Sequence, residues 1–204
     1  MNIAENGSVN RISIEKYLSS SSIIDWHHPL IKNLATQLSH GCSSQMEIAK
    51  KCFDWVRDEI KHSFDYKLNP VTCKASDVLQ YRTGYCYAKS HLLAAVLRAN
   101  SIPTGLCYQR LKMNESDGDF YCLHGLNAIY LSEWGWYRVD ARGNKPGIDA
   151  QFCPPIEKLA FSIKEKSEAN LPKILAEPLD IVVDTLTKYG TFTEVNMNLP
   201  DLKL

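Results

Sequence analysis

The 204-residue sequence has no long apolar run, no net charge and no closely paired cysteines. Because no stretch of about 18 apolar residues occurs, we expect no membrane-spanning helix. The first residues also lack the apolar segment of a secretory signal. The 23 basic residues are balanced by 23 acidic ones, so the chain has no general basic surface for nucleic acid or acidic membranes. The composition favours a soluble globular protein with neither of these partners.

The seven cysteines are an odd number, so they cannot all pair within one chain, and no two have the Cys-x-x-Cys spacing of zinc ribbons and thioredoxin-like sites. The adjacent His27 and His28 have no third ligand at metal spacing, and we expect them to be polar residues at the start of a helix. The sequence predicts no metal and no cofactor. A reducing, cytoplasmic setting is the simplest interpretation.

Helical patterns fill the first half of the chain, and strand patterns follow them. Apolar residues recur at helical spacing in residues 29–40, 45–61, 77–81, 86–99 and 178–189. Ser76 fits the N-cap of the third of these helices. Tyr, Trp, Leu and Ile are enriched in residues 104–111, 120–131 and 134–140, which is typical of strands. Helices followed by consecutive strands predict an α+β fold with an antiparallel sheet.

Cys86 lies at the expected N-terminus of an apolar helix, directly after Gly84-Tyr85. The partial positive charge and free N–H groups of a helix N-terminus stabilise a thiolate and can hold a developing oxyanion. Gly84 allows close approach of the backbone or a positive φ before the thiol. A buried structural cysteine is the common alternative. We expect that ordinary role for the other six cysteines, with Cys122 as a minor rival nucleophile.

His124 and Asp140 lie at the two open ends of a predicted β-hairpin. A three-residue loop over 131–133 would place Tyr130 opposite Trp134, and the same register would make His124 and Asp140 direct cross-strand neighbours. A carboxylate in that position can orient an imidazole by a hydrogen bond. Taken singly, each residue also fits an ordinary role, as a half-buried strand histidine or a turn-forming aspartate.

Three sequence blocks resemble the core of the transglutaminase-like superfamily. They are Ala75-Ser76-Asp77-Val78-Leu79 leading through Gly84-Tyr85-Cys86 to Ile102-Pro103, then His124-Gly125-Leu126-Asn127, and then Trp136-Tyr137-Arg138-Val139-Asp140. Residues 53–60 resemble the helix that precedes this core. The flanking residues, from Asp25 to Pro200, are similar to a bacterial subgroup that includes proteins described as cysteine proteases. The resemblance implies a papain-like fold, with a nucleophile helix packed on an antiparallel sheet and extra N- and C-terminal helices.

The resemblance also implies roles for the candidate residues. Cys86 would be the nucleophile, His124 the general base and acid, and Asp140 the residue that orients His124. The shared chemistry is acyl transfer through a thioester to water or to an amine. The resemblance does not identify the second oxyanion donor: it could be His62, Tyr66 or neither of them.

The chain departs from the animal cross-linking enzymes of the superfamily. Tyr85 and Tyr87 flank Cys86 where those enzymes have Gln and Trp, and no acidic cluster of calcium-loop type is present. We therefore expect a peptidase or amidase that acts on peptide-like amides. Transfer of glutamine acyl groups to amines is one alternative. A non-catalytic binding module that keeps the fold is the other, although all three positions of the triad are filled.

The length favours one domain over residues 1–204. We expect its core at about 45–142, an N-terminal helical extension over 1–44 that begins with a polar arm at 1–12, and a C-terminal extension over 143–204. Specificity is expected in the loops at 112–120 and 142–155. The sequence does not indicate an oligomeric state.

Overall fold

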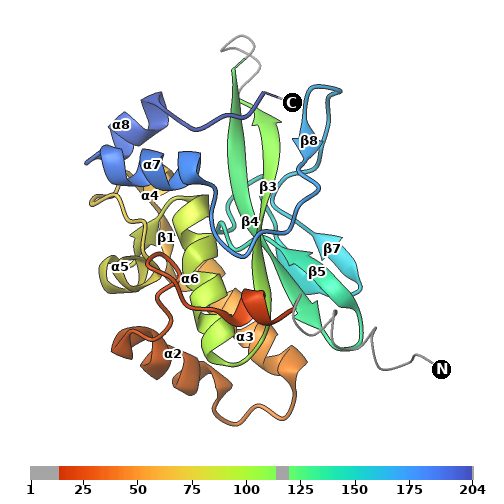
Figure 1. Cartoon of the computed structure of the whole chain (residues 1–204). Coiled ribbons are helices and arrows are strands. Elements are labelled where there is room, and N and C mark those ends of the chain that lie inside the picture. Colours follow the sequence, from red (N-terminus) through yellow and green to blue (C-terminus); the bar gives the residue numbers. More distant parts are fainter. Residues whose placement is uncertain (1–13, 114–119, 204) are drawn as a thin grey trace, which may run out of the picture.

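Figure 1 shows the computed structural model of the chain, which describes residues 14–113 and 120–203. Helices lie on one side of a curled antiparallel sheet (Figure 1). This arrangement confirms the predicted α+β class with a helix packed on an antiparallel sheet. The polar arm expected at residues 1–12, and most of the loop expected at 112–120, lie outside the described residues.

Helix α6 (Cys86–Ala99) is the central element, between the other helices and the sheet (Figure 1). All of its residues from Cys86 to Arg98 are buried, as expected of a helix that is covered on every side. The helices that pack against it are α2 (Pro29–Ser39), α3 (Gln45–Glu59) and α5 (Ala75–Tyr81). None of the helices in the described part of the chain is long and apolar enough to cross a membrane.

The ends of these helices follow from local chemistry. Helix α2 begins at Pro29, whose missing N–H would have no partner there, and the His28 side chain accepts a hydrogen bond from the backbone N–H of Leu30. The Ser44 side chain caps α3 in the same way. The expected cap of α5 is wrong: the helix begins at Ala75, so Ser76 lies in its first turn. There the Ser76 hydroxyl donates to the Asp25 carboxylate at 2.5 Å.

The main sheet has the strand order β5-β4-β3-β8, with antiparallel pairing throughout. Its strands are β3 (Thr104–Lys112), β4 (Tyr121–Leu131), β5 (Gly135–Val139) and β8 (Ala169–Asn170). Helix α6 packs against β3 and β4. At this interface the Asn127 side chain donates to the carbonyl oxygen of Ser90 at 3.0 Å.

The register of the β4–β5 hairpin differs from the predicted one by two residues. Tyr130 pairs with Trp136 instead of Trp134. The cause is Gly135, which takes a φ of +71° after the loop at 132–134. Glycine adopts this left-handed conformation readily, and the turn of a short hairpin loop is commonly followed by a residue in this conformation. The prediction had placed the loop one residue too early and had Trp134 in the strand.

Short elements complete the fold. They are η1 (Lys16–Leu18), β1 (Lys61–His62), α4 (Ser63–Tyr66), β2 (Thr83–Gly84), β6 (Gln151–Cys153), β7 (Ile156–Lys158), α7 (Asp180–Lys188) and α8 (Phe192–Met197). β1 pairs in parallel with β2, and this pairing brings His62 next to the residues that lead into α6. Helix α8 lies at the same end of α6, because the Tyr85 hydroxyl donates to the carbonyl oxygen of Phe192 at 2.6 Å.

A buried arginine joins α6 to segments near both ends of the chain. The Arg98 side chain is inaccessible to solvent. Its guanidinium donates to the carbonyl oxygens of Ser19 at 2.7 Å, Thr104 at 2.9 and 3.0 Å, and Ala176 at 2.5 Å. A buried cation is tolerated when its donors are satisfied in this way. These bonds hold the segments before α2 and before α7 against the core.

Candidate active site

Cys86 is the first residue of α6, and its thiol lies beside β4. Its N-cap residue, Tyr85, supplies no side-chain cap, so the first N–H groups of the helix remain available to another acceptor. Gly84 allows a close approach and has no positive φ: a Cβ there would lie 3.0 Å from the Cβ of Ala88. Cys86 is 7% exposed and lines a cavity.

Gly125 sets the contact between the start of α6 and β4. A Cβ at this position would lie 3.0 Å from the Cα of Tyr87, so only glycine allows the two backbones to approach this closely. The Gly125 N–H donates to the sulfur of Cys86 at 3.4 Å. Since His124 precedes Gly125, this contact brings the imidazole next to the thiol.

His124 and Asp140 form a hydrogen bond of 2.7 Å between Nε2 and Oδ2. Asp140 directly follows β5, and extending the observed register by one residue makes it a diagonal neighbour of His124, not the direct neighbour that we predicted. A shift of two residues keeps both side chains on one face, whereas a shift of one would have separated them. The expected contact therefore forms through a different register.

The Asp140 carboxylate is fully buried and has several donors. Its Oδ1 accepts from the N–H of Arg142, and its Oδ2 accepts from the N–H of Ala160, both at 3.1 Å. Burial alone would raise the pKa of Asp140. The charge of His124 and these hydrogen bonds outweigh burial and lower the pKa below its ordinary value. Asp140 therefore stays ionised beside His124.

The environment of His124 favours the protonated imidazole. Burial alone would lower the pKa of His124, but the charges of Asp140 and Cys86, and hydrogen bonds to both, raise it to about 10. Because Nε2 faces Asp140, Nδ1 is the nitrogen left for Cys86. The ring of Phe161 lies edge-on to His124, with centroids 4.9 Å apart. This ring helps to keep water from the imidazole–carboxylate pair.

The cavity beside Cys86 has a volume of about 640 Å³. Cys86, His124 and Cys122 all line it. Cys122 is the rival thiol, and burial raises its pKa to about 12, which disfavours its thiolate. Apolar side chains that also line the cavity are Phe64, Leu111, Met113, Ile148, Phe161 and Leu199. The mixed lining suits a peptide-like ligand.

The structure separates the two candidates for the second oxyanion donor. His62 is 7% exposed and lines the Cys86 cavity, whereas Tyr66 is 55% exposed and does not line it. The His62 ring packs edge-on against Tyr85, with centroids 5.5 Å apart. Burial, and then the charge of Arg142, lower the pKa of His62 well below its usual range. Of the two candidates for the second oxyanion donor, the structure therefore places only His62, in its neutral form, at the Cys86 cavity.

Several residues of the site carried no signal in the sequence. Arg142 and Ala160 bind Asp140 through backbone N–H groups in loops, where no periodic pattern applies. Lys89 is fully buried, and its ammonium donates to the carbonyl oxygens of Arg57 and Ile60 at the end of α3. Only Gly125 could have been found, because a glycine inside a strand pattern often marks a close backbone approach.

His91 and the remaining cysteines lie away from this chemistry. The ring of His91 is buried and its Nδ1 is 2.8 Å from the carbonyl oxygen of Cys73, so it faces away from the thiol, as its helical position predicts. All seven cysteines are free thiols. In the parts of the chain that the structure describes, no cluster of His, Cys, Asp and Glu could hold a metal ion.

Comparison with known proteins places this site in a family. Among solved structures, the "Putative Cysteine Protease from Cytophaga hutchinsonii" is similar with a TM-score of 0.50 and 20% identity, over 64% of this chain and 42% of that chain. The periplasmic domain of TgpA from Pseudomonas aeruginosa has a TM-score of 0.46 and 22% identity, over 61% and 45% of the two chains. The chain thus spans less than half the length of either structure. No curated protein matches it.

The comparison with family models is more specific. Residues 32–141 match the model of the transglutaminase-like superfamily. This range covers more than half of the chain and includes Cys86, His124 and Asp140. The solved structure from Cytophaga hutchinsonii agrees with the fold that this match implies. The chain therefore belongs to the transglutaminase-like superfamily.

Proposed function

We propose that the protein is a thiol enzyme that cleaves peptide-like amides through an acyl-thioester on Cys86. The observation that carries this proposal is the buried 2.7 Å bond between His124 and Asp140, next to a thiol that lines an open cavity. A cysteine with a neighbouring histidine, itself oriented by a third group, is the arrangement that nucleophilic catalysis requires.

The first half of the reaction forms the thioester. The Cys86 thiolate attacks the carbonyl carbon, a C–S bond forms, and the carbonyl oxygen takes the negative charge. Free N–H groups at the start of α6 are placed to stabilise this oxyanion. Protonated His124 then donates its proton to the amide nitrogen, the C–N bond breaks, and the amine leaves.

The second half regenerates the enzyme. Water attacks the thioester carbon, and the now neutral His124 accepts the proton that the water loses. The tetrahedral intermediate collapses with release of a carboxylic acid and of the Cys86 thiolate. Asp140 stabilises the imidazolium whenever His124 carries its extra proton, and its burial keeps this pair in a site with little competing water.

Transfer of the acyl group to an amine is the second candidate reaction, because an amine can replace water in the same step. Tyr85 and Tyr87 flank Cys86 where the animal cross-linking enzymes have Gln and Trp. Their hydroxyls bind the carbonyl oxygens of Phe192 and Leu123. We propose hydrolysis as the main reaction because of this difference from the cross-linking enzymes.

Activity profiling with a library of peptides and amides tests the proposal. The wild type is compared with Cys86→Ala and with Cys122→Ala, which removes the other thiol of the same cavity. We expect turnover to be lost in Cys86→Ala and kept in Cys122→Ala. Turnover that survives in Cys86→Ala would contradict the assignment. Assays with and without an added primary amine separate hydrolysis from transfer.

A further inference from the structure

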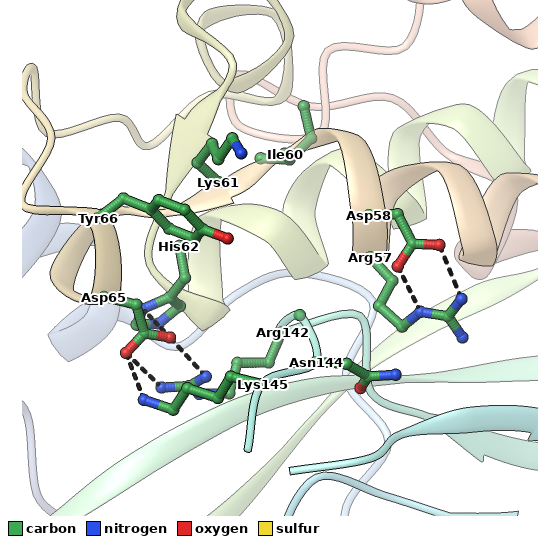
Figure 2. Close-up of a pocket in the computed structure, with 11 residues that line it drawn as sticks. Arg57, Asp58, Ile60, Lys61, His62, Asp65, Tyr66, Arg142, Asn144 and Lys145 are labelled. Carbon is green, nitrogen blue, oxygen red and sulfur yellow. Dashed lines mark hydrogen bonds and ion pairs between the residues drawn. The ribbon is translucent and has the colours of Figure 1, made fainter.

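Figure 2 shows the residues that line a second cavity, which has a volume of about 300 Å³. His62, Arg142 and Lys145 line both cavities. These three side chains form the boundary between the two cavities, so a ligand that occupied both would contact them. The groups that line this second cavity determine which part of a substrate it can hold.

Positive charge dominates the second cavity. Its charged lining residues are Arg57, Lys61, Arg142, Lys145, Asp58 and Asp65. Arg142 and Lys145 share one carboxylate: the Arg142 Nη atoms lie 2.7 and 3.1 Å from the two Asp65 oxygens, and Lys145 Nζ lies 2.6 Å from one of them (Figure 2). One carboxylate cannot neutralise two cations, so this pair of side chains retains a positive charge.

The other two cations differ in their partners. Arg57 is neutralised by Asp58, with two bonds of 2.8 Å, and binds the carbonyl oxygen of Ala150. Lys61 Nζ lies 4.5 Å from the centroid of the Tyr66 ring and has no carboxylate partner in the described part of the chain. Lys61 therefore adds a second uncompensated charge to the cavity.

A buried polar group at the junction of the cavities also lacks a partner. His62 Nδ1 is buried and makes no hydrogen bond within the described residues; the nearest Asp65 oxygen is 3.6 Å away. Buried polar atoms normally have a partner. The neutral imidazole adds no charge of its own, but it can donate or accept a hydrogen bond when a ligand enters.

We propose that this second cavity binds a free carboxylate of the substrate. This proposal rests on the proposed function, because the cavity is a substrate subsite only if a reaction takes place at Cys86. Lys61 and Lys145 offer point charges, and Arg142 has N–H donors beyond the two that bind Asp65. Both can serve a carboxylate, which peptides carry either at the C-terminus or on an acidic side chain. The enzyme would thus select amides that also carry a free carboxylate.

Three thiol-alkylating reagents test the proposal and separate the two sources of carboxylate. N-Iodoacetyl-glutamine has a free α-carboxylate, its isomer N-iodoacetyl-isoglutamine has a free γ-carboxylate, and N-iodoacetyl-glutamine amide is neutral. The second-order rate constant for labelling Cys86 is measured by mass spectrometry. We expect at least one carboxylate reagent to label the wild type about tenfold faster than the neutral reagent, the gain from one hydrogen bond to a charged group. The faster isomer identifies the source.

Matched double variants locate the effect. Lys61→Gln with Lys145→Gln should remove the preference, so that the carboxylate reagents and the neutral reagent label Cys86 at equal rates. Lys50→Gln with Lys158→Gln removes the same charge at two exposed lysines that line neither cavity, and it should keep the preference. Equal rates for all three reagents, or a preference that survives the first double variant, would overturn the proposal.

A failure of the proposed function gives a different result, because Cys86 would then react no faster than the other thiols with the neutral reagent. In that case calorimetry on Cys86→Ala decides about the cavity. Acetyl-glutamine or acetyl-isoglutamine should bind more tightly than acetyl-glutamine amide, and the Lys61 and Lys145 substitutions should abolish the difference. Equal binding of the three compounds would rule out the carboxylate subsite.

Discussion

Asp140 and His124 are held together in a site that excludes solvent, so each strongly affects the charge of the other. Asp140 is fully buried and receives backbone N–H groups from Arg142 and Ala160 besides the imidazole. Such a carboxylate fixes both the tautomer and the orientation of the histidine. It can do this only as an anion.

Replacing the Asp140 carboxylate by an amide should therefore reduce catalysis far more than stability. In Asp140→Asn, the amide cannot hold a charged imidazole, and we expect kcat/KM to fall by roughly 100- to 10,000-fold. Turnover of a substrate found in the amide library measures the change. Asp149→Asn, at an exposed carboxylate outside both cavities, is the control and should retain activity. Activity that persists in Asp140→Asn would contradict the role of the carboxylate.

The raised pKa of His124 predicts how stability depends on pH. The folded pKa of about 10 lies above the ordinary value of 6.5. The contribution of His124 to stability should therefore be complete below about pH 6.5 and lost as the pH rises through 10. Urea unfolding of wild type and His124→Ala at pH 6, 8 and 10 measures it. The difference in unfolding free energy should shrink as the pH rises, and a constant difference would show that His124 does not titrate in this way.

At the scale of secondary structure, the contact between α6 and β4 sets the distance between thiol and imidazole. Gly125 permits this contact, because a Cβ there would lie 3.0 Å from backbone and ring atoms of Tyr87. The backbone atoms cannot move without moving the start of α6. The geometry of the site thus depends on a residue without a side chain.

Gly125→Ala should separate Cys86 from His124. We expect labelling of Cys86 by iodoacetamide to slow by more than about tenfold, and the unfolding free energy to fall by about 1–3 kcal/mol, as for an overpacked core. Gly190→Ala is the matched control. Its φ is not positive, and the nearest atom to a Cβ is a Glu194 carboxylate oxygen at 3.9 Å, an ordinary contact distance, so both measurements should stay near wild type. Equal behaviour of the two variants would contradict the steric argument.

The sequence predicts the long elements better than the connections between them. Helix α6 has its predicted bounds, Cys86 to Ala99, because an apolar helix that starts after Gly84 and stops before Pro103 leaves little choice. The hairpin register was wrong because it depends on the backbone conformation of one residue, Gly135. The two-residue strands β1 and β2 are too short for a periodic signal, yet they position His62.

The candidate site shows the same division. Cys86, His124 and Asp140 could be proposed from position and resemblance because each lies in or directly beside a recognisable element: Cys86 begins α6, His124 is in β4 and Asp140 follows β5. Other partners come from loops whose conformation follows from the whole fold. Examples are the N–H of Ala160 on Asp140, and the pairing of Arg142 with Asp65 across 77 positions of the chain.

At the scale of the whole molecule, segments outside the family core contribute to the active-site cavity. Asn196 and Leu199, near the end of the chain, line the cavity beside Cys86. Arg98 joins α6 to Ser19 and Ala176 through buried hydrogen bonds. The organisation of residues 1–204 as one domain stays a prediction, and these contacts support it.

Arg98→Lys should weaken the hydrogen bonds to Ser19 and Ala176 while it keeps the positive charge. A lysine has three donors on one nitrogen, whereas the Arg98 guanidinium makes four hydrogen bonds from three separate nitrogens. In Arg98→Lys, some of these carbonyl oxygens would therefore remain buried without a donor. We expect the unfolding free energy to fall by about 2–4 kcal/mol, measured by urea titration. Arg110→Lys, at a more exposed ion pair with Asp201, should cost much less. Equal losses in the two variants would argue against a special role for Arg98.

The central claim is that Cys86 is an activated nucleophile paired with His124. Competitive labelling of all seven cysteines with iodoacetamide at pH 6, below the ordinary thiol pKa of about 8.5, tests it most directly. We expect Cys86 to react faster than the exposed Cys153, although Cys86 is buried, and to lose this advantage in His124→Ala. Faster labelling of Cys153, or an unchanged rate for Cys86 in His124→Ala, would contradict the claim.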